Sequence, residues 1–434
     1  MTRPTSLAGW LAYLETLHPK TIALGLDRVR DVAALLPLAL TAPVITVAGT
    51  NGKGSTCAML EAILRAVGYR VGVYTSPHLR RYHERVRIAG DFASDSDLLT
   101  AFDAVEDARV GDAGNGATPL TYFEFGTLAA LWLFARAKLD ALVLEVGLGG
   151  RLDAVNLIDA DVAVVTSVDL DHMDFLGPTR DDIGREKAGI FRAGRPAVCG
   201  ERTPPAALVD AARAIGASLL RLGREFDFVV EGRQWRYRGP NGERYGLPVP
   251  ALRGDHQFGN AAVVLTVLDL MRERLPVPTG AIRDGLVSVE LPGRFQVLPG
   301  RPTIVLDVAH NPQAARALSA ALGAMGFHSQ TFAVFGMYAD KDIRAVVDTM
   351  KARVDRWYVA GLRGARGAPA LMIVEKLRAA GVAQPAIHTF DSIVAAYRAA
   401  CDAASDADRI IVFGSFLTVA AALDANAPTE PKQS

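Results

Sequence analysis

The chain has 434 residues, half of them hydrophobic, which is enough to form two or three domains with large cores. Lys+Arg and Asp+Glu both number 47, and the formal net charge of +0 gives no electrostatic reason to expect a nucleic acid or an anionic membrane as partner. The three cysteines, Cys57, Cys199 and Cys401, are widely spaced and lack a C-x-x-C pattern, which indicates a reduced compartment. No basic segment followed by an apolar stretch opens the chain, so we predict a cytoplasmic location.

From residue 43 the chain alternates short β-branched runs with longer helical patterns, which predicts a parallel sheet covered by helices on both faces. Strands are predicted at residues 43–48, 71–74, 141–146, 162–168 and 196–199, and a largely buried helix at 122–138. Residues 32–52 are uncharged and long enough to raise the question of a membrane span, but Pro37 and Pro43 argue against one continuous helix. The glycine-rich residues 111–119 predict a flexible loop, interpreted as a mobile lid.

The second half of the chain predicts a small hairpin and then a second α/β unit. Residues 226–247 alternate aromatic and polar positions around the turn signal Pro240-Asn241-Gly242, which favours an antiparallel hairpin at the edge of the first domain. Further strands are predicted at residues 303–306, 331–335, 356–359 and 410–413, and a disordered tail at 425–434. The Pro292-Gly293 pair marks the boundary, so we predict domains at 1–296 and 297–434.

The most informative segment, residues 44–55, reads V-I-T-V-A-G-T-N-G-K-G-S. A buried strand leads into a turn whose glycines let backbone N–H groups face an anion, and the following helix adds its positive end. Lys53 supplies a mobile charge for the β- and γ-phosphates. The spacing departs from G-x-x-x-x-G-K-[ST], because Val47 stands at the first glycine and Gly54 at the hydroxyl residue, which arrives at Ser55. The alternative is a plain strand-to-helix turn with a solvated lysine, but the order of all the parts favours a variant phosphate-binding loop.

Other polar residues end or follow the predicted strands of the first domain, where the carboxyl ends of parallel strands converge on one crevice. Thr75-Ser76-Pro77-His78 is either a turn or part of the site. Glu145 lies in an apolar run and needs a salt bridge or a bound cation. The acidic loop after residue 168 could hold Mg²⁺ or be solvated; its members are Asp169, Asp171, His172 and Asp174. Lys187 reads locally as a surface lysine.

The second domain repeats this design twice. Asp307 and His310 follow one predicted strand and either face a ligand or cap the next helix, which Pro312 begins. Gly414 and Ser415 follow another and could bind an anion such as a carboxylate. Each signal is weak by itself.

Nine segments taken in chain order resemble the folylpolyglutamate synthase/dihydrofolate synthase family of Mur-ligase-like amide ligases. The resemblance covers nearly the whole chain. The segments are G-T-N-G-K-G-S (49–55), T-S-P-H-L (75–79), L-T-Y-F-E-F-G-T (120–127), E-V-G-L-G-G-R-L-D-A-V-N (145–156), L-D-H (170–172), E-K-A-G-I (186–190), H-Q-x-x-N-A-A (256–262), P-G-R (292–294) and D-x-A-H-N-P (307–312).

The resemblance implies an α/β fold in which a P-loop-type, mostly parallel sheet domain is followed by a smaller Rossmann-like domain. ATP would be held by Asn51, Gly52, Lys53, Gly54, Ser55, Asn260, Arg294 and Asp307. Two Mg²⁺ ions would be bound with the help of Ser55, Ser76, Glu145 and His172. The catalytic set would be Lys53, Glu145, His172, Lys187 and His310, with Lys187 carboxylated to N6-carboxylysine.

The resemblance also implies the substrates. His310 and Ser415 would place L-glutamate. The pterin-bearing acceptor would lie against three segments, which comprise Gly25, Leu26, Asp27, Arg28, Thr121, Tyr122, Phe123, Glu124, Phe125, Leu152, Asp153 and Ala154. The Y-F-E-F sequence at 122–125 is similar to the bifunctional bacterial form, so both dihydropteroate and tetrahydrofolate are expected acceptors. A monomer without a nucleic-acid or membrane partner is expected.

Three alternatives stay open at this point. The first is a monofunctional folylpolyglutamate synthase. The second is a Mur-type peptidoglycan ligase, although the 48 residues before Gly49 are too few for its additional domain. The third is a nucleotide switch without ligase activity, which would not need Asp307, His310 and Ser415.

Overall fold

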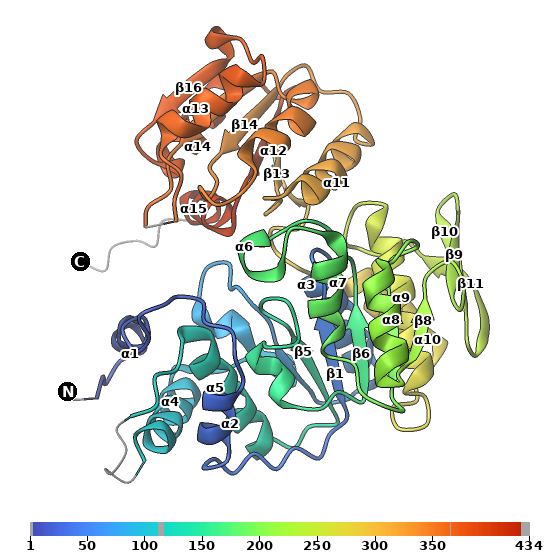
Figure 1. Cartoon of the computed structure of the whole chain (residues 1–434). Helices are drawn as coiled ribbons and strands as arrows, with labels where there is room; N and C mark the ends of the chain where they lie inside the picture. The colour runs from blue at the N-terminus through green and yellow to red at the C-terminus, as the bar shows by residue number, and fades with distance from the viewer. Residues whose placement is uncertain (1–2, 112–116, 365, 427–434) are drawn as a thin grey trace, which may run out of the picture. The chain divides into compact units, whose positions relative to one another are not determined.

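The structure, a computed structural model, describes residues 3–111, 117–364 and 366–426. The chain divides into two compact units (Figure 1). The first unit runs to Ala251 and resumes over Phe258–Val289, and the second comprises Leu252–Gln257 and Glu290 onward. The second unit therefore begins before the predicted boundary at 296/297.

The first unit is built on an eight-stranded sheet with the order β4-β3-β2-β5-β1-β6-β7-β8. The strands from β2 to β8 in this order are parallel, and the edge strands β3 and β4 are antiparallel. The strands are β1 (Val44–Ala48), β2 (Val71–Tyr74), β3 (Val86–Ile88), β4 (Asp91–Phe92), β5 (Ala141–Glu145), β6 (Val162–Val165), β7 (Pro196–Cys199) and β8 (Ser218–Arg221).

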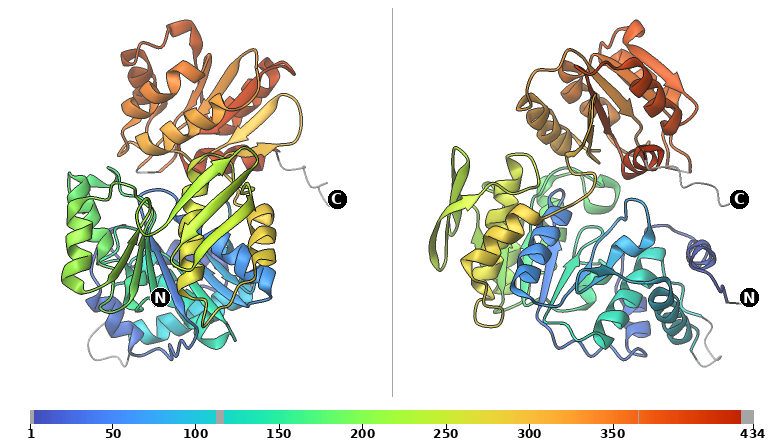
Figure 2. Two further views of the ribbon diagram at one scale, coloured as in Figure 1. Left: turned by 90° about the vertical axis from the view of Figure 1, so that its right-hand side faces the viewer. Right: turned by 180° about the vertical axis from the view of Figure 1, so that it is seen from behind.

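Helices cover both faces of this sheet, as the predicted βα alternation requires (Figure 2). They are α1 (Leu7–Leu14), α2 (Asp27–Ala33), α3 (Lys53–Val67), α4 (Asp95–Val110), α5 (Tyr122–Arg136), α6 (Met173–Leu176), α7 (Arg180–Ala188), α8 (Ala206–Ile215), α9 (His256–Leu270) and α10 (Thr279–Ser288), with the 3-10 helices η1 (Tyr82–Arg85) and η2 (Ala154–Leu157). Helix α10 approaches α3 so closely that a Cβ at Gly285 would lie 2.5 Å from the side chain of Ile63.

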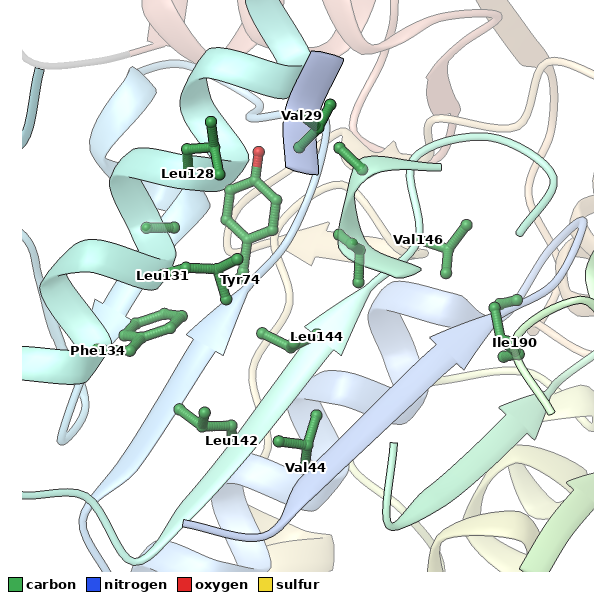
Figure 3. Packing of buried hydrophobic residues seen from close by; sticks show 14 of the residues in the cluster. Val29, Val44, Tyr74, Leu128, Leu131, Phe134, Leu142, Leu144, Val146 and Ile190 are labelled. Atoms are coloured by element: carbon green, nitrogen blue, oxygen red, sulfur yellow. The ribbon is translucent and has the colours of Figure 1, made fainter. Parts of the chain in front are cut away.

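The sheet face under α5 belongs to the hydrophobic core of the first unit. Figure 3 shows Leu142 and Leu144 of β5 lying toward Leu131 and Phe134 of α5, with Tyr74 of β2 next to Leu131. All of these side chains are at most 2% exposed. The carboxyl ends of β1, β2, β5 and β6 are therefore held on a rigid platform, and the loops that follow them have fixed starting points.

A separate three-stranded antiparallel sheet stands at the periphery of the first unit, next to α9 and α10 (Figures 1 and 2). Its strands are β9 (Asp227–Glu231), β10 (Gln234–Gly239) and β11 (Gly242–Pro248). The predicted hairpin is thus the β10–β11 part of a larger element, and Tyr237 ties it to α9 through Asp269 at 3.1 Å.

The second unit contains a six-stranded sheet with the order β12-β13-β17-β14-β15-β16, parallel except for the edge strand β12. Its strands are β12 (Gln296–Leu298), β13 (Thr303–Leu306), β14 (Thr331–Phe335), β15 (Arg356–Ala360), β16 (Ile387–Phe390) and β17 (Arg409–Phe413). Its helical segments are α11 (Pro312–Gly323), α12 (Ile343–Met350), η3 (Lys351–Arg353), α13 (Ala370–Ala379), η4 (Gln384–Ala386), α14 (Ile393–Ala403) and α15 (Phe416–Asn426).

The fold class and every predicted strand outside the small sheet are confirmed, while short edge strands were missed. The predicted lid falls largely on residues 112–116, and most of the predicted tail on 427–434; both lie outside the described residues. The tail prediction is wrong at residues 425 and 426, which belong to α15. In the part of the chain that the structure describes, no helix is long and apolar enough to cross a membrane. Cys57 and Cys199 are buried and unbonded, and Cys401 is half-buried.

Candidate active site

The phosphate-binding loop follows β1, and its shape depends on two glycines. Gly49 has φ +154°, and a Cβ there would lie 1.8 Å from the Thr166 hydroxyl of the loop after β6. Gly52 has φ +86° and is the N-cap of α3, so no side chain caps the first turn of this helix. The backbone of Asn51 is fixed on both sides, since its carbonyl accepts from Thr166 at 2.6 Å and its N–H donates to Ser167 at 3.0 Å. The loop is preformed, with the amino end of α3 directed at it.

Lys53 folds back over this loop. Its Nζ donates to the Gly49 carbonyl at 2.9 Å and to the Thr50 carbonyl at 3.4 Å. Asn260 of α9 lies beside the same turn, because a Cβ at Gly52 would be only 2.7 Å from its Oδ1. The structure thus brings Asn260 to the loop from a distant part of the sequence, and its contact with ATP stays a prediction.

Glu145 ends β5 directly beside the loop strand, where Val47 is its register partner. Glu145 is 4% exposed, and its carboxylate accepts from the Ser76 N–H at 3.1 Å, so two of the predicted metal residues are neighbours. Burial and then the charge of Glu145 raise the pKa of the Cys57 thiol. A carboxylate and a hydroxyl are oxygen donors of the kind Mg²⁺ binds, and they fit this ion.

His172 is the third predicted metal ligand from a strand end. It has φ +51°, an unusual left-handed conformation for a residue with a Cβ, and it is the N-cap of α6. Its Nε2 lies 3.9 Å from the Asp171 carboxylate. Within the described residues, no group of three or more His, Cys, Asp and Glu side chains could hold a metal ion by itself. A cation here would therefore take ligands from hydroxyls or from a bound phosphate as well.

Lys187 is not the surface lysine that its local sequence indicates. It is 3% exposed in α7, and burial, followed by the charge of Lys53, lowers its pKa from 10.5 to about 7, against the opposing effect of Asp171 and Asp153. Two predicted catalytic lysines are thus close enough to influence each other electrostatically. A buried amine with this pKa is largely neutral above pH 7 and therefore nucleophilic.

The three predicted acceptor segments meet in the structure. The Gly25 N–H donates to the Leu152 carbonyl at 3.3 Å. Arg28 makes a two-pronged ion pair with Glu124, at 2.9 and 2.6 Å, and Glu124 is 5% exposed. Thr121 is the N-cap of α5, and its N–H donates to the same Glu124 carboxylate at 2.8 Å. Three segments that are separate in the sequence are therefore joined by these contacts.

Several residues of these segments have structural roles in this arrangement. Phe125 is fully buried between Trp10 and Phe102, so its side chain belongs to the core. Asp153 is 4% exposed and accepts from the N–H groups of Leu148 and Val155, and burial raises its pKa to about 7.

The other members of the segments differ in their exposure to solvent. Tyr122 and Phe123 are half-buried, and Phe123 packs against Tyr74 and against Gly147, where a Cβ would be 2.7 Å from the ring. Leu26 and Ala154 are buried, and Asp27 is exposed. Contact of each of these residues with an acceptor stays a prediction.

In the second unit, Asp307 braces the loop that carries Arg294. Its carboxylate accepts from the N–H groups of Phe295 at 2.9 Å and Ala309 at 2.8 Å. Removal from water raises its pKa, and the Arg294 guanidinium opposes that increase. Arg294 also lies 5.3 Å from the centre of the Phe416 ring. The helix cap that Asp307 could have provided is made instead by Asn311, which accepts from Ala314 at 2.9 Å, with Pro312 at the first helical position.

His310 and Ser415 lie at the carboxyl ends of neighbouring strands, since β13 and β17 are paired. The Nδ1 atom of His310 is 2.8 Å from the Val308 carbonyl, which fixes its ring. Ser415 is 1% exposed, and its hydroxyl accepts from the Thr418 N–H at 3.0 Å, so it caps α15. The capping role weakens the prediction that Ser415 touches glutamate directly.

Sequence reasoning missed the residues that shape the phosphate loop from the next strand. Thr166 and Ser167 supply three hydroxyl contacts to it. The available signal was a Thr-Ser pair at the carboxyl end of a strand adjacent to β1, a place where hydroxyls can fix a loop.

Comparison with known proteins identifies both units. The Mur ligase middle domain matches residues 47–268, and the Mur ligase glutamate ligase domain matches residues 293–416. The chain is 49% identical over 415 residues to the dihydrofolate synthase/folylpolyglutamate synthase of Escherichia coli, covering 95% of this chain and 94% of the relative. It is similar to E. coli FolC in complex with DHPP and ADP, with 48% identity, a TM-score of 0.90 and 97% of each chain covered.

A second solved structure, a bifunctional folylpolyglutamate synthase/dihydrofolate synthase with Mn, AMPPNP and L-glutamate bound, gives a TM-score of 0.89 at 48% identity. It covers 97% of this chain and 98% of its own.

Proposed function

Because this chain belongs to the dihydrofolate synthase/folylpolyglutamate synthase family of Mur ligases, we propose that it joins L-glutamate to two acceptors at the expense of ATP. The first is dihydropteroate, which gives dihydrofolate, and the second is the γ-carboxylate of tetrahydrofolate, which gives a polyglutamate. The observation that carries the proposal is the preformed phosphate loop, with Lys53 over it and the buried Glu145 beside it.

The reaction follows from these parts. An oxygen of the acceptor carboxylate attacks the γ-phosphorus of ATP, the bond to the bridging oxygen breaks, and ADP leaves with that electron pair. The resulting acyl phosphate is attacked by the amine of L-glutamate, and an amide forms as phosphate departs and the amine loses a proton. The chain needs no nucleophile of its own, because its task is to position the reactants and neutralise charge.

Lys53 and the amides at the start of α3 would hold the β- and γ-phosphates, with Asn51, Gly54 and Ser55 completing the loop. Ser55, Ser76, Glu145 and His172 would hold the divalent cations. Bound Mg²⁺ supplies charge neutralisation on the phosphate oxygens. Asn260 would contact the nucleotide at the loop, and Arg294 and Asp307 would do so from the second unit.

We assign Lys187 a modified side chain. Its buried, largely neutral amine can attack CO₂, which gives a carbamate and releases a proton, and the new carboxylate would be a ligand for a cation near Lys53. Chemical rescue tests this assignment. Activity lost in Lys187→Ala should return with added acetate if a carboxylate acts at this position. Rescue by methylammonium alone would instead assign the role to the unmodified amine.

The region joined by Arg28 and Glu124 would receive the acceptor, and His310 would place L-glutamate. A monomer acting in the cytoplasm stays our proposal, and it rests on the sequence argument alone. Light scattering at micromolar concentration measures the molar mass, and a monomer should give the mass of one chain, 46.2 kDa.

The test of the function is direct. The protein is incubated with ATP, Mg²⁺, L-glutamate and either dihydropteroate or tetrahydrofolate, while released phosphate and product mass are followed. We expect one glutamyl residue to be added to dihydropteroate and one or more to tetrahydrofolate. Product from tetrahydrofolate alone would reduce the assignment to a monofunctional folylpolyglutamate synthase, and phosphate release without an amide would overturn the ligase.

A further inference from the structure

Arg85 is a buried cation in the 3-10 helix η1, only 8% exposed. Its guanidinium lies over two aromatic rings, 5.5 Å from the centre of Tyr82 and 5.4 Å from that of Tyr122. Its Nε donates to His78 Nδ1 at 2.8 Å. Since an arginine N–H is always a donor, this Nδ1 carries a lone pair, and the His78 ring is neutral in this contact. Arg85 is therefore oriented firmly by neutral groups.

No carboxylate of the described residues forms an ion pair with Arg85. Three other arginines of the first unit differ in this respect, because each is paired with a buried glutamate: Arg28 with Glu124, Arg87 with Glu61 and Arg109 with Glu106. A buried charge without a counter-charge is destabilising, so the environment of Arg85 calls for an anion that the described residues do not supply. The buried hydroxyl of Tyr82 also has no hydrogen-bond partner in the described structure.

Arg85 lies next to groups that the proposed reaction uses. Its carbonyl accepts from the Thr75 N–H at 2.9 Å, and the adjacent Ser76 N–H donates to Glu145. On its other side it stacks on Tyr122, at the start of α5 and in one of the acceptor segments. The backbone of Arg85 is thus bonded to the segment that leads into the expected metal site, and its guanidinium lies on a ring of one of the acceptor segments.

We propose that Arg85 binds the α-carboxylate of the terminal glutamyl residue of tetrahydrofolate and so determines specificity for that acceptor. This inference rests on the proposed function. The two acceptors differ in the relevant chemistry, because dihydropteroate carries only the benzoate carboxylate that reacts. The terminal glutamate of tetrahydrofolate carries a reacting γ-carboxylate and, a short aliphatic chain away, an α-carboxylate that does not react. A planar guanidinium matches a carboxylate with two parallel hydrogen bonds.

The first test uses the unmodified protein and a changed acceptor. An analogue of tetrahydrofolate with 4-aminobutyrate in place of glutamate keeps the reacting carboxylate and lacks only the α-carboxylate. We expect kcat/KM for this analogue to be lower than for tetrahydrofolate by on the order of 10- to 100-fold, the usual effect of a charge-assisted contact. Equal kcat/KM for the two compounds would overturn the proposal without touching the ligase assignment.

The second test changes the arginine. Arg85→Met keeps length and removes the charge, Arg85→Lys keeps the charge and removes the planar fork, and Arg81→Met in the same segment is an exposed control. We expect Arg85→Met to lower kcat/KM with tetrahydrofolate by on the order of 10- to 100-fold and to use the analogue no worse than tetrahydrofolate. Arg85→Lys should restore part of the difference between the two compounds.

The ratio between acceptors distinguishes this role from a structural one. If Arg85 only supports the loop, the Met variant will lose activity with dihydropteroate and tetrahydrofolate in the same proportion, which would overturn the proposal. If Arg85→Met does not fold, the proposal is decided by the comparison of tetrahydrofolate with its analogue, because that comparison uses the protein without substitutions. Absence of any product from dihydropteroate in the unmodified protein would instead contradict the proposed function.

Discussion

Replacing Lys187 by methionine should make the protein more stable, and most so at low pH. Methionine fills nearly the same volume without a charge. Burial lowers the pKa of this amine from 10.5 to about 7 in the folded chain. Below pH 7 the folded protein must therefore keep a charged amine out of water, which is destabilising.

The magnitude follows from the two pKa values. Between pH 7 and 10.5 the unfolded chain binds this proton and the folded chain does not, so the free energy of unfolding rises with pH in that window. Each pH unit corresponds to about 1.4 kcal/mol. Compared with an uncharged side chain, the lysine therefore lowers the free energy of unfolding by about 5 kcal/mol at pH 6 and by about 2 kcal/mol at pH 9. The stability gap between the variant and the unmodified protein should shrink by about 3 kcal/mol over this range.

Urea unfolding of both proteins at pH 6, 7.5 and 9 measures this gap, in buffers free of CO₂ so that the amine stays unmodified. The difference between the free energies of unfolding of the two proteins contains only the contribution of residue 187, because the titration of all other groups is common to both. A gap that stays constant within about 0.5 kcal/mol would refute the argument that this lysine is buried and neutral near pH 7.

Three further outcomes follow from the site. Lys53→Met should lower kcat/KM for ATP by on the order of 100- to 1,000-fold with an unchanged unfolding midpoint, and a loss below tenfold would contradict the role of this lysine. Arg28→Met leaves the buried Glu124 carboxylate without its partner. We expect the free energy of unfolding in urea to fall by about 2 to 4 kcal/mol, and the KM for the acceptor to rise more than the KM for ATP. An unchanged stability would argue against the ion pair. Gly52→Ala should raise the KM for ATP by about tenfold. The control is Gly68→Ala, which lies at the other end of the same helix with open space around it; it should lower the free energy of unfolding by about 1 to 2 kcal/mol and leave the KM for ATP unchanged.

The sequence predicted the elements that have a strong local signal. The strands Val71–Tyr74, Pro196–Cys199 and Thr303–Leu306 have the predicted bounds, because each is an apolar run bounded by turn or charged residues. The short strands β3, β4 and β12 were missed because two or three residues carry too little periodicity to detect. They form by pairing with a neighbour that is already in place.

The sequence places Lys53 and Glu145 at strand ends, and in the structure Lys53 lies over the glycine loop and Glu145 ends the neighbouring strand, while their roles stay predictions. The site was not predictable where tertiary burial changes a residue. Lys187 resembles any exposed helical lysine in sequence, and only the packing of α7 removes it from water. Similarly, no local pattern shows that Arg85 lacks a carboxylate partner among the described residues. That property depends on segments that are distant in the chain.

The claim that one site activates a carboxylate through phosphoryl transfer can be tested with an isotope. Dihydropteroate labelled with oxygen-18 in its carboxylate is converted with ATP, Mg²⁺ and L-glutamate, and the released phosphate is analysed by mass spectrometry. The account predicts that each phosphate carries one labelled oxygen, since that oxygen bridges carbon and phosphorus in the acyl phosphate. Unlabelled phosphate together with amide product would contradict it.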